Sequence, residues 1–146
     1  MPAAHSVSEI RVRYGETDQM GVAYHANYLV WCEIGRTDLI RTLGPSYADM
    51  ERDGLRLAVA EASVRYRAPA RYDDVVQVET RLDKAQSRFV TFSYRIVLDR
   101  PAAAGTPGTL LATASTVLVA LDDAGRTRVM PAHVRELFQG FVHDRT

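Results

Sequence analysis

The chain contains a single cysteine, has no net charge and lacks a long apolar run, and each absence excludes a class of function. Cys32 cannot form an internal disulfide and has no second sulfur with which to share a metal ion, which favours a reducing compartment. The 18 basic residues are balanced by 18 acidic ones, so no overall field attracts nucleic acid or anionic lipid. We therefore expect neither a metal site nor a nucleic-acid partner.

Targeting segments and internal repeats are also absent from the sequence. Residues 1–10 do not join positive charge to an apolar segment, so we expect a cytoplasmic protein without membrane insertion. The 146 residues, 47% hydrophobic and 25% charged, are typical of one globular domain. We expect that single domain to span residues 1–146.

Hydrophobic periodicity predicts a strand followed by a long helix. Residues 7–14 alternate as a first strand, with Tyr14 on its half-buried face, and a helical period follows over residues 26–43. Gly44 and Pro45 signal the end of this helix. Its apolar stripe, flanked by Leu29 and Ile40, is formed by Tyr28, Cys32, Gly35, Leu39 and Leu43.

The rest of the chain is richer in strand-forming residues. Short turns favour antiparallel neighbours, and the predicted strands cover residues 55–68, 75–84, 88–99 and 109–122. Smaller elements are expected as a helical turn over 47–52, a strand piece over 128–130 and a helix from Pro131 to Phe141. This order predicts an α+β fold, with a long helix against an antiparallel sheet of about five strands.

Two features of the predicted faces bear on packing. Gly35 costs about 1 kcal/mol relative to Ala within a helix, which is easiest to explain if a sheet packs closely there. The strand after Gly54 is expected to cover the helix with its small residues, namely Ala58, Ala60, Ala62 and Val64. Residues 109–121 stay apolar on both faces, more than one helix can cover, so we expect self-association.

The loop from Tyr14 to Tyr28 carries the candidate chemistry. Asp18 precedes His25 by seven residues, and the helix that follows begins with free backbone amides. One such donor stabilises the developing charge on a carbonyl oxygen under attack by about 3 kcal/mol. Asp18 could attack the carbonyl directly or activate a water as general base, and the sequence leaves both open.

Each of these residues also has a structural interpretation. Asp18 could cap a turn beside Gly21, and His25 could be a surface or hydrogen-bonded residue at the helix start. Tyr14 taken alone is a half-buried strand aromatic, and Glu16 is expected to be solvated. Cys32 is expected to be a small buried hydrophobe rather than a nucleophile, and Glu33 and Arg36 to pair on the helix surface.

The combined pattern resembles the signature of the hotdog-fold thioesterases in the 4-hydroxybenzoyl-CoA thioesterase superfamily. Within it, Tyr14, Asp18 and His25 resemble the Tol-Pal-associated (YbgC-like) acyl-CoA thioesterase branch more than the 4-hydroxybenzoyl-CoA enzyme, which has Pro directly after its Asp. The resemblance covers nearly the whole chain. It rests on Tyr14, Asp18, Gly21, Val22, Tyr24, His25, Asn27, Tyr28, Glu33 and Arg36.

This resemblance implies a hotdog fold, in which a curved antiparallel sheet wraps a central helix, and an acyl-CoA substrate hydrolysed without a cofactor. It implies Asp18 as the essential carboxylate, the His25 amide as the main oxyanion donor, and Tyr14 and the His25 side chain as supporting groups. Tyr24, Asn27 and Tyr28 are expected beside the substrate, with Asn27 fixing the helix start. A homodimer or homotetramer would build the site between protomers.

The phosphates of coenzyme A require positive groups near the site. The resemblance points to the turn with Lys84, Ser87 and Arg88, and a second candidate is the cluster of Arg65, Arg67 and Arg71; ordinary solvated charge is the alternative for both. The acyl pocket has five candidate lining residues, namely Tyr28, Trp31, Tyr47, Met50 and Leu57.

Two other functions stay open on the same scaffold. One is a hotdog-fold dehydratase, although the chain lacks a His-Phe-Pro-Gly-like segment. The other is a noncatalytic acyl-CoA-binding module, because a fold alone does not establish chemistry.

Overall fold

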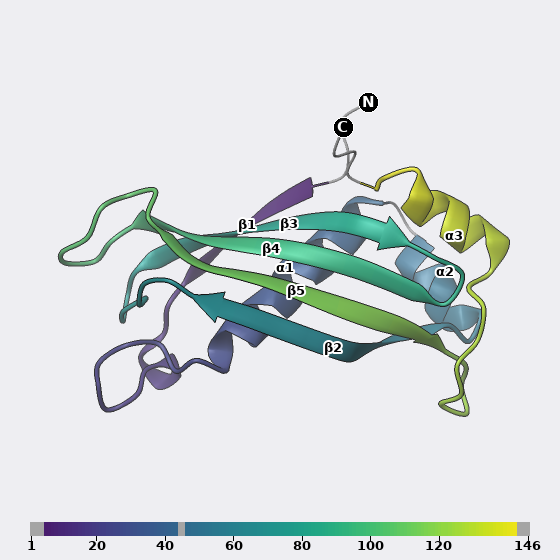
Figure 1. Cartoon of the computed structure of the whole chain (residues 1–146), viewed down its shortest axis with the longest axis horizontal. Helices are drawn as coiled ribbons and strands as arrows, with labels where there is room; N and C mark the ends of the chain where they lie inside the picture. Colours follow the sequence, from purple (N-terminus) through teal and green to yellow (C-terminus); the bar gives the residue numbers. More distant parts are fainter. Residues whose placement is uncertain (1–4, 44–45, 143–146) are drawn as a thin grey trace.

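A computed structural model describes residues 5–43 and 46–142 and places five strands in one antiparallel sheet, with a long helix across one face (Figure 1). The strands lie in the order β1-β3-β4-β5-β2. Their bounds are β1 His5–Arg11, β2 Arg56–Tyr66, β3 Val75–Ala85, β4 Phe89–Arg100 and β5 Leu110–Leu121. The expected α+β class and five-stranded antiparallel sheet are confirmed.

The helices occupy two different places around the sheet. The long helix α1, Asn27–Thr42, begins near the loop of residues 12–26, at the end of the sheet opposite α2 and α3 (Figure 1). The short helices are α2, Ser46–Arg52, and α3, Ala132–Gln139. The expected stop signal at Gly44 and Pro45 lies outside the described residues.

The helix α1 presses against β3 at its glycine. A Cβ atom built on Gly35 would lie 2.3 Å from Thr80 Oγ1 and 2.9 Å from Val78 Cγ1, so only glycine allows this approach. The expected close packing is therefore confirmed. The predicted apolar stripe is buried along its length, and of its two flanking residues Ile40 is buried and Leu29 is exposed.

The predicted faces of β2 are wrong at its first half. The register with β5 shifts between Val59 and Glu61, so Ala60 is a bulge. A bulge inserts one residue and thereby reverses the alternation of faces. Ala62 lies opposite the buried Thr116 and faces α1, while Ala58 lies opposite Val119 and faces away.

Two further boundaries differ from the expectation. The first strand ends at Arg11, and Tyr14 lies beyond it in a 3-10 turn, Tyr14–Glu16, with its side chain exposed. Residues 128–130 form no strand; the Arg128 amide bonds to Ala120 O, and the Met130 amide to Ser87 O.

Among residues 5–43 and 46–142, no helix is long and apolar enough to cross a membrane.

Candidate active site

Asp18 lies in a small hairpin that connects the 3-10 turn to α1. Thr17 and Ala23 form its bridge, and the Asp18 amide donates to Val22 O at 2.9 Å. The turn closes through a bond from the Gly21 amide to Asp18 O at 3.0 Å, and Gly21 has φ of 79°, a left-handed conformation that favours glycine.

The carboxylate of Asp18 has one structural contact and one open oxygen. Oδ1 accepts the Met20 amide at 2.9 Å, which is the turn-capping role weighed as an alternative. Within residues 5–43 and 46–142, no donor reaches Oδ2. A half-buried carboxylate fixed through one oxygen, with the other available, is equipped to act as a nucleophile or a base.

The start of α1 supplies the donors that an oxyanion requires. The backbone N–H groups of His25 and Ala26 donate no hydrogen bond within the described part of the chain, whereas the Tyr24 amide before them and the Asn27 amide after them both donate. They precede a helix of 16 residues, whose dipole adds positive potential at this end. Tyr66 Oη donates to His25 O at 2.8 Å and holds this segment against β2.

A hollow of about 300 Å³ opens beside this helix start. Tyr28 and Tyr66 form one wall, with ring centroids 5.0 Å apart in an edge-on arrangement. Burial raises the pKa of both phenols, so they remain neutral at physiological pH. The lining residues are Val22, Ala23, His25, Tyr28, Tyr66, Arg67, Ala68 and Pro69.

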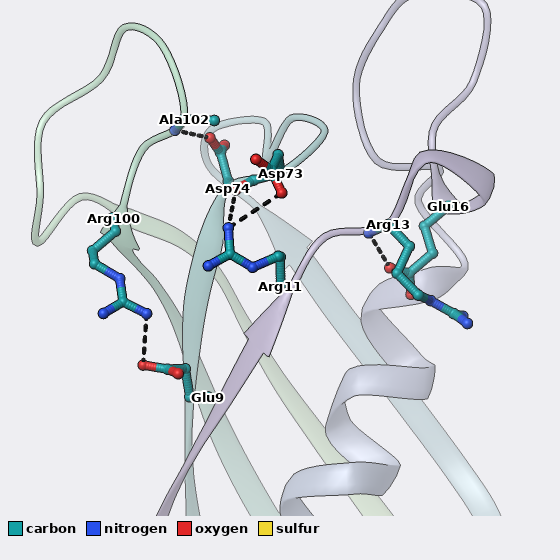
Figure 2. A network of polar contacts seen from close by, with 8 residues as sticks. All are labelled: Glu9, Arg11, Arg13, Glu16, Asp73, Asp74, Arg100 and Ala102. Atoms are coloured by element: carbon teal, nitrogen blue, oxygen red, sulfur yellow. Dashed lines mark hydrogen bonds and ion pairs between the residues drawn. The ribbon is translucent and has the colours of Figure 1, made fainter.

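Glu16 is the site residue whose environment was predicted wrongly. Its side chain is buried instead of solvated, and its carboxylate accepts the Arg13 amide at 2.8 Å and Trp31 Nε1 at 3.0 Å (Figure 2 shows the first contact). Tyr66 was not among the predicted site residues, because nothing in the sequence shows that its hydroxyl donates to His25 O. No sequence signal marked either residue.

A second buried carboxylate anchors the neighbouring loops. Asp74 accepts the Arg71 amide at 2.8 Å through Oδ2 and the Ala102 amide at 2.9 Å through Oδ1. The Ala23 amide donates to Ala70 O, which attaches the Asp18 hairpin to the same loop. Figure 2 shows Asp74 beside two exposed ion pairs at this end of the sheet, Arg11 with Asp73 and Glu9 with Arg100.

The other predicted residues of the loop have the following positions. Tyr14 contacts Tyr72 edge-on at 5.6 Å and does not line the hollow. Tyr24 packs against the His25 ring at 4.4 Å on the exposed side. Asn27 Nδ2 donates to Glu16 O at 2.8 Å, which fixes the helix start and occupies that donor.

The two basic clusters lie at opposite ends of the sheet. The β3–β4 turn carries Lys84, Ser87 and Arg88. The length of β3 separates this turn from the start of the strand, and roughly ten strand residues span about 30 Å. One chain therefore does not bring them to Asp18. The second cluster does adjoin the site, since Arg67 lines the hollow; among the described residues no side-chain partner binds Arg65, Arg67 or Arg71.

The five candidate acyl-pocket residues do not lie together in one pocket. Tyr28 lines the hollow beside His25, whereas Met50 and Leu57 line another hollow of about 500 Å³ at the opposite end of β2. Trp31 is fully buried, and the side chain of Tyr47 lies outside the described residues.

The cysteine on the buried face of α1 is not reactive. Burial raises the pKa of Cys32 to about 12, so its thiol stays protonated, as its expected role as a buried hydrophobe requires. Arg36 does not pair with Glu33 on the surface as expected; it is buried and donates to Tyr94 Oη at 3.2 Å. No three potential metal ligands converge within residues 5–43 and 46–142.

Known proteins are similar to this chain over most of its length. A family model described as the thioesterase-like superfamily matches residues 12–138. YneP of Bacillus subtilis is 45% identical over 91 residues, 62% of this chain and 66% of that protein. The acyl-CoA thioesterase YbgC of Haemophilus influenzae is 31% identical over 135 residues, 92% of each chain.

A solved structure gives the same result for the fold. The DHNA-CoA thioesterase from Staphylococcus aureus superposes with a TM-score of 0.83 at 33% identity, covering 93% of this chain and 89% of that chain. The expected resemblance to hotdog-fold thioesterases, including the YbgC-like branch, is confirmed.

Proposed function

This chain belongs to the thioesterase-like superfamily, and we propose that it hydrolyses acyl-CoA thioesters at the site formed by Asp18 and the start of α1. The class of enzyme rests on the family match and on relatives that carry the name acyl-CoA thioesterase. The residue roles rest on one observation in particular. Two adjacent backbone amides beside a hollow in the surface, those of His25 and Ala26, have no acceptor among residues 5–43 and 46–142.

The proposed reaction begins with the thioester carbonyl oxygen bound to these amides. As the carbonyl carbon is attacked, charge develops on that oxygen, and preorganised donors stabilise it more than they stabilise the ground state. The carbon–sulfur bond then breaks, and the sulfur leaves as the thiolate of coenzyme A and takes up a proton.

Asp18 can serve this reaction by two routes. As nucleophile, its carboxylate adds to the carbonyl carbon and forms an anhydride, which water hydrolyses to free acid and regenerated Asp18. As general base, it removes a proton from the attacking water. Both routes require the oxygen Oδ2 that has no donor within the described residues, while Oδ1 holds the turn through Met20.

We also propose that two copies complete the site. β2 is an edge strand with no further strand paired to it among the described residues, and Val59 and Tyr66 on it are exposed. Val30 and Ile34 add exposed apolar surface on α1. Antiparallel pairing of two β2 edges would cover this surface and bring the hollow beside Met50 of one copy toward the hollow beside His25 of the other.

The phosphates of coenzyme A are proposed to bind at Arg65, Arg67 and Arg71. Arg67 lines the hollow, and all three guanidinium groups lack a partner among the described residues. The Lys84 turn would reach the site only from a second copy. Phosphate favours the planar donor pattern of arginine.

The proposed activity is tested by thiol release from purified protein. A panel of short, medium, long and aromatic acyl-CoAs is supplied, and free coenzyme A is measured over time. Hydrolysis of at least one member above the uncatalysed background is expected. Tight binding of the panel with no release would favour the noncatalytic alternative and refute the proposal.

A further inference from the structure

Glu16 makes more hydrogen bonds than its position in a short turn requires. Besides the two contacts of its carboxylate, to the Arg13 amide and to Trp31 Nε1, its backbone oxygen accepts two bonds. The Tyr24 amide donates to it at 2.8 Å, and Asn27 Nδ2 donates at 2.8 Å. The residue thus joins the 3-10 turn, the far end of the Asp18 hairpin and the first turns of α1.

The carboxylate is chemically suited to this place. Both of its partners, the Arg13 amide and the Trp31 indole, are donors, so the group between them must accept on both oxygens. An ionised carboxylate accepts on both, whereas an amide of the same shape presents an NH₂ group to one of the donors. The Nε of Arg13 lies 3.6 Å from Oε1 and adds positive charge on the exposed side.

The residues joined by these bonds lie next to both proposed reacting groups in the sequence. Asp18 follows Glu16 by two residues, and His25 directly follows Tyr24, whose amide is bonded to Glu16 O. The hairpin that separates Asp18 from the His25 amide is therefore closed at its base by Glu16. The buried indole of Trp31 fixes this base to α1.

We propose that Glu16 is a positioning residue that sets the separation between the Asp18 carboxylate and the His25 amide. The inference rests on the proposed function, because it assigns a role in that reaction. Glu16 does not touch the substrate; it acts through the geometry of the two groups that do. A misplacement of about 1 Å can cost roughly a hundredfold in rate. Loosening the closed end of the hairpin is therefore expected to lower the turnover rate more than it weakens substrate binding.

Glu16→Gln is the direct test, because it keeps the shape and reverses one hydrogen bond. We expect kcat to fall about tenfold or more, with KM unchanged within about twofold. The chain has a single tryptophan, so the emission of Trp31 reports its contact with residue 16 without interference. The emission maximum is expected to shift while the far-ultraviolet circular dichroism is retained.

Two further variants separate positioning from simple stability. Ser8→Ala removes a partly buried tether between β1 and α1, the 2.6 Å bond to Asp38, and is expected to lower Tm with kcat retained. Trp31→Phe removes the same bond to Glu16 from the other side, and it should reproduce the loss of kcat. If Glu16→Gln does not fold, the kcat of Trp31→Phe tests the inference in its place.

The outcomes are distinct. A folded Glu16→Gln protein with kcat within about twofold of wild type overturns the inference, as does a rise in KM with kcat intact. If the wild type is active and the kcat of Glu16→Gln is unchanged, the inference fails and the proposed function stands. If the wild-type chain releases no thiol from any acyl-CoA, the proposed function fails and this inference fails with it.

Discussion

Replacing Gly35 by alanine tests the contact that seats α1 on the sheet. The added Cβ would lie 2.3 Å from Thr80 Oγ1 and 2.9 Å from Val78 Cγ1, both well inside ordinary contact distance. Neither neighbour can swing away freely, because both are β-branched side chains buried under the helix. The helix must therefore lift from β3 or the strand must shift.

The expected loss of stability follows from two opposing effects. Overpacking in a close-packed core costs about 1–3 kcal/mol, and the overlap here places Gly35→Ala at or above the upper end. Alanine recovers about 1 kcal/mol through its better helix propensity. We expect a net destabilisation of about 2 kcal/mol, which corresponds to roughly 6 °C in Tm for a chain of this size.

The measurement is urea unfolding followed by circular dichroism, at one fixed protein concentration because association would add to stability. Gly15→Ala is the matched control, since a Cβ there meets nothing within 4 Å and stability should hold. Thr80→Ala should partly rescue Gly35→Ala, as it removes the nearest atom, a hydroxyl with no partner among the described residues. Gly35→Ala with wild-type stability would refute the close contact between α1 and β3.

Three other predictions concern the thiol, the phosphates and assembly. With a pKa raised to about 12, Cys32 carries very little thiolate at pH 8, so a thiol reagent should label the native chain slowly and the urea-unfolded chain at one thiol per chain; rapid native labelling would contradict its burial. Arg67→Ala should raise KM for an acyl-CoA about tenfold and leave the same acyl group on phosphate-free N-acetylcysteamine unaffected, whereas Arg88→Ala should change neither; the reverse pattern would favour the Lys84 turn. Light scattering should give at least twice the 16.3 kDa chain mass, and Val59→Lys on the β2 edge should lower it; a monomeric, active wild type would refute the shared site.

The elements of the fold could be predicted because each has a clear period. The helical stripe that includes Cys32, Gly35 and Leu39 is buried as expected, and the five strands of the sheet begin and end within a few residues of their predicted bounds, although the expected strand piece over 128–130 does not form. The alternation on β2 failed because one inserted residue, Ala60, reverses the faces. A bulge leaves no mark in a pattern of apolar and polar residues, so the outward direction of Ala58 could not be read from the sequence.

The site could be predicted only in part. Asp18 and the His25 amide are local to one segment, and the sequence order alone brings the helix start close behind the loop. Glu16 was expected to be solvated because nothing in the sequence shows that the indole of Trp31, fifteen residues away, donates to it. Tyr14 was expected on a strand face, but the strand ends earlier and the chain turns there.

The measurement that most directly tests the proposed chemistry is turnover by Asp18→Asn. Asparagine keeps an oxygen that can accept the Met20 amide, so the hairpin and the fold should persist. It removes the charge needed for attack or for activating water, and kcat for the best acyl-CoA should fall by a factor on the order of a hundred or more. An unchanged kcat in the folded variant would contradict the assignment of Asp18 as the catalytic carboxylate.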